Sequence, residues 1–139
     1  MKVSTRNQLK GTVSSIKKGA VNSEVILDLP GSAQITAIIT NGAVANLGLT
    51  EGEEALALIK ASNVILGTDV KQISARNLLC GKIVSVTDGA VNAEVSVDLG
   101  EGTVITSIIT EASVKRLGLS SGQEVCAIFK ASSVILATL

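Results

Sequence analysis

The stretch GAVNSEVILDL at residues 19–29 recurs 70 positions later as GAVNAEVSVDL at residues 89–99. The similarity extends without a gap over Ser4–Thr68 and Ser74–Thr138, where 33 of the 65 aligned positions are identical. Self-similarity at one fixed offset indicates that a single structural unit has been duplicated within the chain. The sequence therefore predicts two tandem modules, residues 1–68 and 73–139, with a short linker over residues 67–73.

Short runs rich in Val and Ile predict that each module is built mainly of strands. The strands expected in the first copy are residues 9–16, 24–29, 34–40, 54–59 and 61–66. A short helix is expected after the third strand, because Thr40 or Asn41 can cap its start and Gly48 can end it. The predicted fold class is all-β with a small helix, arranged as two tandem OB-like Greek-key β-barrels.

The charge balance and the scarcity of aromatic residues argue against nucleic-acid binding. Lys and Arg together number 12, as do Asp and Glu, so the formal net charge is zero. A nucleic-acid surface usually carries a basic excess. Phe129 is the only aromatic residue, whereas a platform that stacks single-stranded bases needs several. A nucleic-acid-binding barrel is therefore the least favoured alternative.

The residues that carry most enzyme and metal chemistry are missing. The chain has no His, and its two cysteines, Cys80 and Cys126, do not form a CxxC pair, so no site for a metal cation is expected. We expect both cysteines to be small buried core residues. Glu24 and Asp28 alternate along a strand and are interpreted as solvated carboxylates. With no base to activate a nucleophile, we expect neither an enzyme nor a bound cofactor.

No segment suggests export or membrane insertion. The N-terminal residues lack the basic, apolar and small-residue order of a signal peptide, and no apolar run is long enough to span a bilayer. We therefore expect a cytoplasmic protein that contacts no membrane.

Polar residues that are identical in both copies indicate an anion site, because a hydrophobic core does not require them. Each copy has a Ser-x-Arg-Asn segment, an Ile-Thr pair before the expected helix and a Lys-Ala-Ser segment. Their side chains and backbone offer hydrogen-bond donors, which suit a tetrahedral dianion. Singly, each residue also fits a surface or capping role; repetition at fixed spacing favours the anion site. The candidate ligands are Ser4, Arg6, Asn7, Thr40, Lys60, Ala61 and Ser62, with the copies Ser74, Arg76, Asn77, Thr110, Lys130, Ala131 and Ser132.

The repeated Gly-Ala-Val-Asn segment is a second candidate site. It consists of Gly19, Ala20, Val21 and Asn22 in the first copy and Gly89, Ala90, Val91 and Asn92 in the second. Gly and Asn are common in plain turns, and the residues alone favour that interpretation. The alternative is a nest of backbone N–H groups that faces an anion.

Taken together, these motifs resemble the Mop domain of the molbindins, and their tandem layout resembles the di-Mop molbindins. The resemblance covers essentially the whole chain, twice. It implies OB-like barrels that bind molybdate or tungstate in the cytoplasm, two anions of nearly equal size and charge. It also implies a ring of six modules, and hence a homotrimer of this chain.

The resemblance further implies two kinds of site. One lies between modules of different subunits and combines the Ser-x-Arg and Lys-Ala-Ser segments with Thr40 or Thr110 and the helix start at Ala43 or Ser113. The other lies near the threefold axis and uses the two Gly-Ala-Val-Asn turns. Because Ser113 has a hydroxyl group and Ala43 has none, we expect sites that use the first helix to bind more weakly.

The predicted function is storage and homeostasis of molybdate or tungstate by reversible binding. One alternative is the ligand-sensing module of a molybdate-responsive regulator or transporter. The other is the nucleic-acid-binding barrel that composition disfavours.

Overall fold

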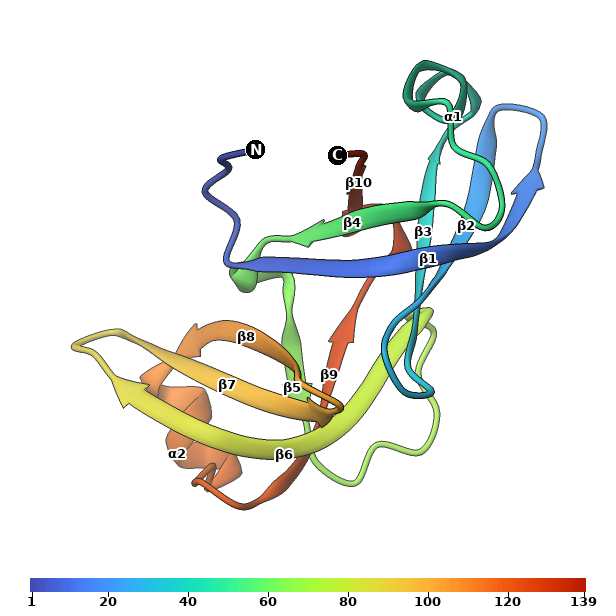
Figure 1. Cartoon of the computed structure of the whole chain (residues 1–139). Coiled ribbons are helices and arrows are strands. Elements are labelled where there is room, and N and C mark those ends of the chain that lie inside the picture. Colours follow the sequence, from blue (N-terminus) through green and yellow to red (C-terminus); the bar gives the residue numbers. More distant parts are fainter.

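The chain forms two five-stranded antiparallel sheets in a computed structural model that describes residues 1–139 (Figure 1). The elements of the first copy are β1 (Asn7–Lys18), β2 (Asn22–Asp28), β3 (Gln34–Thr40), α1 (Asn41–Leu47), β4 (Glu54–Ile59), the 3-10 helix η1 (Ala61–Asn63) and β5 (Ile65–Gly67). Those of the second copy are β6 (Asn77–Asp88), β7 (Asn92–Gly100), β8 (Thr103–Thr110), α2 (Glu111–Leu117), β9 (Glu124–Phe129), η2 (Ala131–Ser133) and β10 (Ile135–Ala137).

The sheets have the Greek-key order that the sequence predicts. The first sheet runs β10-β4-β1-β2-β3 and the second β5-β9-β6-β7-β8, so the fourth strand of each copy returns to lie beside the first. The outer strand β10 also contacts β3, and β5 contacts β8, so each sheet curls towards a barrel. The all-β class with a small helix in each copy is confirmed.

The long first strand of each copy can pair on both sides because a glycine allows close approach. A Cβ atom on Gly11 would lie 2.7 Å from the carbonyl oxygen of Asp28, and one on Gly81 would lie 2.1 Å from that of Asp98. The ladder between β1 and β2 shifts register between Val13 and Ser15, which marks a bulge. The backbones therefore approach closely at Gly11, and the bulge lies just beyond it.

The short helix begins and ends where the sequence predicts. The Thr40 side chain accepts a hydrogen bond from the Ala43 N–H at 3.0 Å, which satisfies one of the free donors of the first turn. Gly48 ends α1 in the left-handed conformation, with φ of 62°. Thr110 and Gly118 play the same two roles for α2.

The fifth strand corrects the prediction for residues 61–66. Residues Ala61–Asn63 form η1, and only Ile65–Gly67 extend as a strand. That strand, β5, pairs with β9 of the second copy, while β10 pairs with β4 of the first. The two copies thus exchange their last strands, and Figure 1 shows β10 and the C-terminus beside β4. The two modules divided at residues 67–73 therefore stay a prediction, because each sheet contains a strand from the other side of that boundary.

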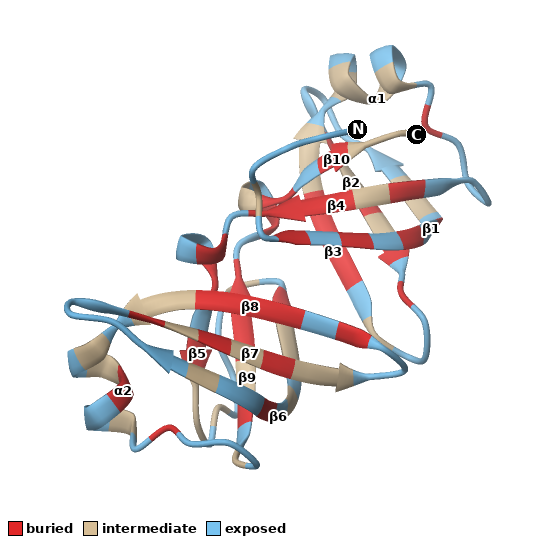
Figure 2. Ribbon diagram, turned by 60° about the vertical axis from the view of Figure 1, so that its left-hand side comes forward, coloured by how far each residue is buried: buried red, intermediate tan, exposed pale blue.

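The hydrophobic core is continuous between the two copies. One cluster of 25 buried residues includes Val64 and Leu66 together with Val95, Ile105 and Phe129 of the other half. Figure 2 shows the buried stretches meeting where the two sheets approach each other. Because side chains of the exchanged segments fill this region, much of the hydrophobic stabilisation of each half depends on the other.

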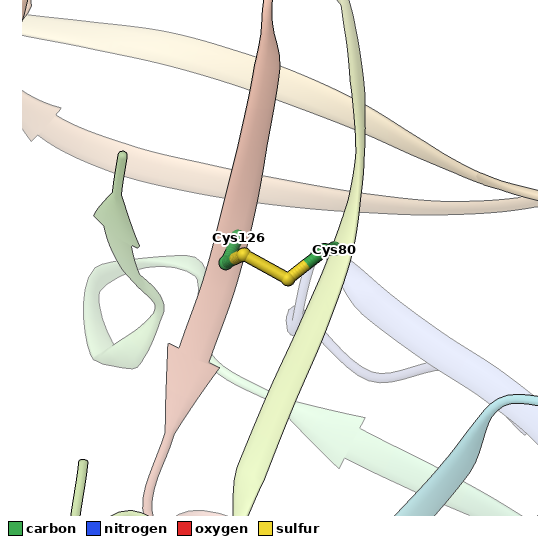
Figure 3. The surroundings of a disulfide bond; sticks show 2 residues. All are labelled: Cys80 and Cys126. Carbon is green, nitrogen blue, oxygen red and sulfur yellow. A yellow bond between two sulfur atoms is a disulfide. The ribbon is translucent and has the colours of Figure 1, made fainter. Parts of the chain in front are cut away.

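The two cysteines are not the buried core residues that were expected. Cys80 on β6 and Cys126 on β9 are direct cross-strand partners and form a disulfide (Figure 3). Cys80 is exposed and Cys126 half-buried, so the pair lies on the outer face of the sheet. Lys10 and Leu56 occupy the equivalent register positions of the first copy, so the cross-link is specific to the second.

Neither helix has the length and apolar character that a membrane-spanning segment requires.

Candidate functional site

The Ser-x-Arg and Lys-Ala-Ser segments meet at one end of the β1–β4 pair. Asn7 and Ile59 are the last residues of that ladder, so Arg6 and Lys60 lie just beyond it, next to neighbouring strands of the same sheet. Both cations are exposed. The second copy repeats this arrangement, because Asn77 pairs with Phe129 in the same register. The structure therefore brings together two segments that lie more than fifty residues apart in the sequence.

The remaining members of these segments divide between surface and core. The serines Ser4, Ser62, Ser74 and Ser132 and the cation Lys130 are exposed. Ala61 and Ala131 are buried at the first positions of η1 and η2. In each copy these exposed polar residues belong to two segments that leave the same end of the sheet, and a buried alanine lies between the lysine and the second serine.

The structure gives Asn7 and Asn77 a different role from the predicted one. Asn7 is buried, and its Nδ2 donates to the Thr106 carbonyl at 2.8 Å while its Oδ1 accepts from the Thr106 N–H at 2.7 Å. Asn77 makes the reciprocal pair of bonds to the backbone of Thr36, each at 2.8 Å. Both amides therefore dock onto the central part of the third strand of the other copy, and we leave them out of the proposed anion site.

Each arginine of the candidate site pairs with a glutamate of the other copy. Arg6 Nη1 and Nη2 donate to the two carboxylate oxygens of Glu94 at 2.5 and 2.7 Å. Arg76 Nη1 donates to Glu24 at 2.8 Å. The hydrogen bond from Arg6 is the main cause that lowers the pKa of Glu94, and that from Arg76 lowers the pKa of Glu24. All four groups therefore stay ionised at neutral pH.

These pairs correct two expectations. Glu24 is half-buried and paired with an arginine, so it is not the solvated carboxylate that the strand pattern suggested. The candidate site also contains acceptors as well as donors. Glu24 and Glu94 were not predicted as part of the site, although they are identical polar residues at the offset of the repeat. That identity was the signal that could have identified them.

The Gly-Ala-Val-Asn turns form a second group together with the helix starts. Asn22 pairs with Thr40 at the end of the β2–β3 ladder, and the N–H of Asn41 donates to the carbonyl of Val21 at 2.9 Å. Val21 and Val91 are about as exposed as each other, at 71% and 73%. The N–H groups of Ala20 and Val21 have no hydrogen-bond partner within the chain. These unpaired donors fit the alternative interpretation, a nest of backbone N–H groups that faces an anion.

The two copies differ at this turn. In the first copy the Gly19 N–H donates to the Asn22 carbonyl at 2.8 Å, and the Asn41 side chain donates to the Gly19 carbonyl. In the second copy the Gly89 N–H donates instead to the carboxylate of Glu111 at 3.2 Å. An anion at the second turn would therefore lie close to a negative charge that the first turn lacks.

The helix starts also carry hydroxyl groups, but their backbone donors are partly used. The N–H groups of Ala43 and Ser113 donate to Thr40 and Thr110 respectively. The Thr110 hydroxyl also bonds to the Ser113 hydroxyl at 2.9 Å. Each copy thus retains a hydroxyl group that is free to donate, Thr40 in the first and Ser113 in the second.

Within one chain, the structure does not assemble the complete predicted set. No hydrogen bond joins the arginine–lysine segments to the helix starts. Two surface pockets of about 640 Å³ each contain a single predicted ligand, Arg76 in one and Ser74 in the other. The arginine–lysine segments and the Gly-Ala-Val-Asn turns nevertheless come close to each other on β7. Glu94, which pairs with Arg6, lies two residues from Asn92 of the second turn, roughly 7 Å along a strand.

No group of three or more His, Cys, Asp or Glu side chains is arranged to hold a metal ion.

Comparison with known proteins agrees with this architecture. The TOBE domain profile matches twice, over residues 3–66 and 73–136. The chain is 48% identical over 139 residues to the molybdenum-pterin-binding protein MopA of Rhodobacter capsulatus, and 43% identical over 138 residues to the molybdenum transport protein ModE of Azotobacter vinelandii. In both alignments it spans 99% of its own length and about half of the relative's, 52% and 51%.

A solved structure extends the similarity to the whole fold. The cytoplasmic molybdate-binding protein ModG, crystallised with molybdate bound, superimposes with a TM-score of 0.96 at 45% identity, and the match covers 100% of both chains. Both the sequence profile and the three-dimensional arrangement thus include the two copies. The chain therefore belongs to the TOBE domain family, in the tandem arrangement of the di-Mop molbindins that its repeated motifs predicted.

Proposed function

We propose that this protein binds molybdate reversibly as a tetrahedral oxyanion and does so without catalysis. The observation that carries the proposal is that the exposed arginine, lysine and serines lie on two segments that leave the same end of the sheet in both copies. Charge-assisted hydrogen bonds from such groups are about twice as strong as neutral ones. Its relatives MopA, ModE and ModG are named for molybdenum or molybdate, which supports the choice of anion.

The proposed ligands in each copy are the two serines, the arginine and the lysine. They are Ser4, Arg6, Lys60 and Ser62 in the first copy and Ser74, Arg76, Lys130 and Ser132 in the second. Ala61 and Ala131 support the site with the backbone of η1 and η2. We propose that Thr40 or Thr110, with the helix start at Ala43 or Ser113, completes it from a second subunit of a homotrimer. Within one chain, no hydrogen bond joins the arginine–lysine segments to the hydroxyl groups at the helix starts. This separation supports a site that is completed by a second subunit.

We further propose a second kind of site at the Gly-Ala-Val-Asn turns. The unpartnered N–H groups of Ala20 and Val21 support it, since backbone donors in a turn can form an anion-binding nest. The two copies are not equivalent as ligands, because Glu111 lies at the second turn. We expect the turn of the first copy to bind an anion more tightly than the turn of the second.

Storage and homeostasis in the cytoplasm are the role that we propose for this binding. A protein that holds an anion with hydrogen bonds releases it when the free concentration falls, which is the behaviour of a buffer. Tungstate has nearly the size and charge of molybdate, so we propose that it binds at the same sites.

Calorimetric titration with molybdate, tungstate, sulfate and phosphate tests the function, and a mass measurement tests the assembly. We expect heat with molybdate and tungstate, much weaker heat with sulfate and phosphate, and the mass of a trimer. The absence of molybdate heat at micromolar protein would contradict the proposed function. A strictly monomeric mass would contradict sites between subunits.

Thr5 offers an independent check of where the anion lies. Its Oγ1 is the only buried side-chain polar atom without a hydrogen-bond partner, and it stands between Ser4 and Arg6. An unsatisfied buried hydroxyl costs about 1–3 kcal/mol, so Thr5→Val should raise the melting temperature of the ligand-free protein by a few degrees. If the hydroxyl donates to the bound anion, the same variant should bind molybdate more weakly.

Thermal unfolding with and without molybdate measures both effects on Thr5→Val. Ala75 occupies the equivalent position in the second copy, so Ala75→Val is a matched control that should leave molybdate affinity unchanged. Unchanged or tighter binding by Thr5→Val would exclude a contact between this hydroxyl and the anion.

A second candidate function is the ligand-sensing module of a regulator or transporter. The observation that favours it is the alignment with about half the length of ModE. A molybdate-dependent mobility shift with cognate promoter DNA would support the sensing role in a regulator.

A further inference from the structure

Two ion pairs connect the copies reciprocally, and both involve arginines of the proposed anion site. Arg6 of the first copy bonds to Glu94 of the second, and Arg76 of the second copy bonds to Glu24 of the first. The two glutamates are half-buried on the middle strands β7 and β2, while the arginine side chains are half exposed at 49%. Each guanidinium therefore has a carboxylate on one side and solvent on the other.

The glutamates are not needed to fix the backbone beside the arginines. Asn7 directly follows Arg6 and is held by three hydrogen bonds, to the Ile59 carbonyl and to both backbone groups of Thr106. Asn77 fixes the backbone after Arg76 through two bonds to Thr36. The remaining effect of each glutamate falls on the guanidinium group itself. The glutamate carboxylate occupies N–H donors of the arginine and places a negative charge where a dianion would approach.

We propose that Glu24 and Glu94 set the affinity of the oxyanion sites by competing with the anion for Arg76 and Arg6. This inference rests on the proposed function. A guanidinium has five N–H donors, so an arriving anion must share or displace the carboxylate, and the two negative groups repel each other. The glutamates thus weaken binding enough to keep it reversible.

The two pairs also differ in strength, which predicts two classes of site. Glu94 engages both terminal nitrogens of Arg6, whereas Glu24 engages only Nη1 of Arg76. An anion at Arg76 therefore finds the Nη2 group unused, while one at Arg6 finds both terminal nitrogens already bonded to a carboxylate. The site at Arg76 should fill first as molybdate is added.

The test compares molybdate titrations of the wild type, Glu94→Gln and Glu24→Gln. Glutamine keeps the size and one acceptor oxygen but removes the charge. Because exposed ion pairs are worth little, each variant should bind molybdate about two- to fivefold more tightly at the site of its arginine. Glu54→Gln is the matched control: it removes one carboxylate paired with an exposed cation, Lys10, at 3.1 Å. Its molybdate affinity should equal that of the wild type.

A gain in affinity distinguishes competition from a structural role, since a damaged site would bind more weakly. Mass and melting temperature, measured in parallel, report whether the variants keep their assembly and fold. Unchanged or weaker binding by both Glu94→Gln and Glu24→Gln would overturn the inference while leaving the proposed function intact. Equal tightening by Glu54→Gln would also overturn it, because the effect would then come from net charge. Absence of molybdate heat in the wild type would instead overturn the proposed function.

Discussion

Replacing Asn77 by alanine should destabilise the protein by about 2–4 kcal/mol, the largest stability change that we expect from a single polar substitution. The amide is buried and pairs with both backbone groups of Thr36 at 2.8 Å. Alanine would leave that N–H and that carbonyl without partners inside the protein. Each unsatisfied buried group costs about 1–3 kcal/mol. Equilibrium unfolding in urea measures the difference.

Asn63→Ala is the matched control for this prediction. Asn63 is exposed, and its side chain makes no hydrogen bond, so its loss should change the free energy of unfolding by less than about 0.5 kcal/mol. Asn7→Ala should behave like Asn77→Ala, because the two amides dock reciprocally. Equal stability of Asn77→Ala and the wild type would show that the docking of the copies does not depend on these amides.

Replacing Arg6 and Arg76 together by alanine should weaken molybdate binding at least about thirtyfold. Loss of one partner from a buried, hydrogen-bonded charge pair costs about 2–5 kcal/mol, and 2 kcal/mol corresponds to that factor. The fold should survive, because in the ligand-free protein both guanidinium groups are half exposed and exposed ion pairs add little stability. Calorimetry reports affinity and stoichiometry, and thermal unfolding reports the fold.

The double variant Lys10→Ala and Lys82→Ala removes the same charge from exposed positions outside the proposed site. Its molybdate affinity should stay near that of the wild type. If it binds as weakly as the arginine variant, the effect arises from the overall electrostatic field of the protein. Unchanged stoichiometry and affinity after loss of both arginines would remove them from the site.

Most elements of the fold could be predicted from the sequence because they depend on local chemistry; the exception is residues 61–66, where Ala61–Asn63 form a 3-10 helix. Thr40 and Gly48 mark the ends of α1 through capping and a left-handed turn, and neither signal needs a distant partner. Strand exchange could not be predicted, for a specific reason. The segments Val64-Ile65-Leu66 and Val134-Ile135-Leu136 are identical, so either one fits the edge of either sheet. Only the three-dimensional path of the chain decides between them.

The candidate site was predicted in part, for a related reason. Identity between the copies singled out Arg6, Lys60 and Asn7, but it does not separate a residue that binds a ligand from one that docks the copies. Both tasks use the same hydrogen-bonding groups. Burial separates them, since Asn7 is enclosed and Arg6 is exposed. The disulfide was missed because Cys80 and Cys126 become neighbours only through the register of β6 and β9.

The exchange of the last strands has a consequence for how the protein is made. During synthesis the first half emerges from the ribosome long before the second, and domains usually fold as they emerge. Here the first sheet has an open edge at β4 until Ile135–Ala137 are available to cover it, and an open edge is a site for pairing with other chains. A premature stop codon in place of Ile135 would remove β10 and leave the second sheet with all of its strands. The damage would fall on the half that was translated first.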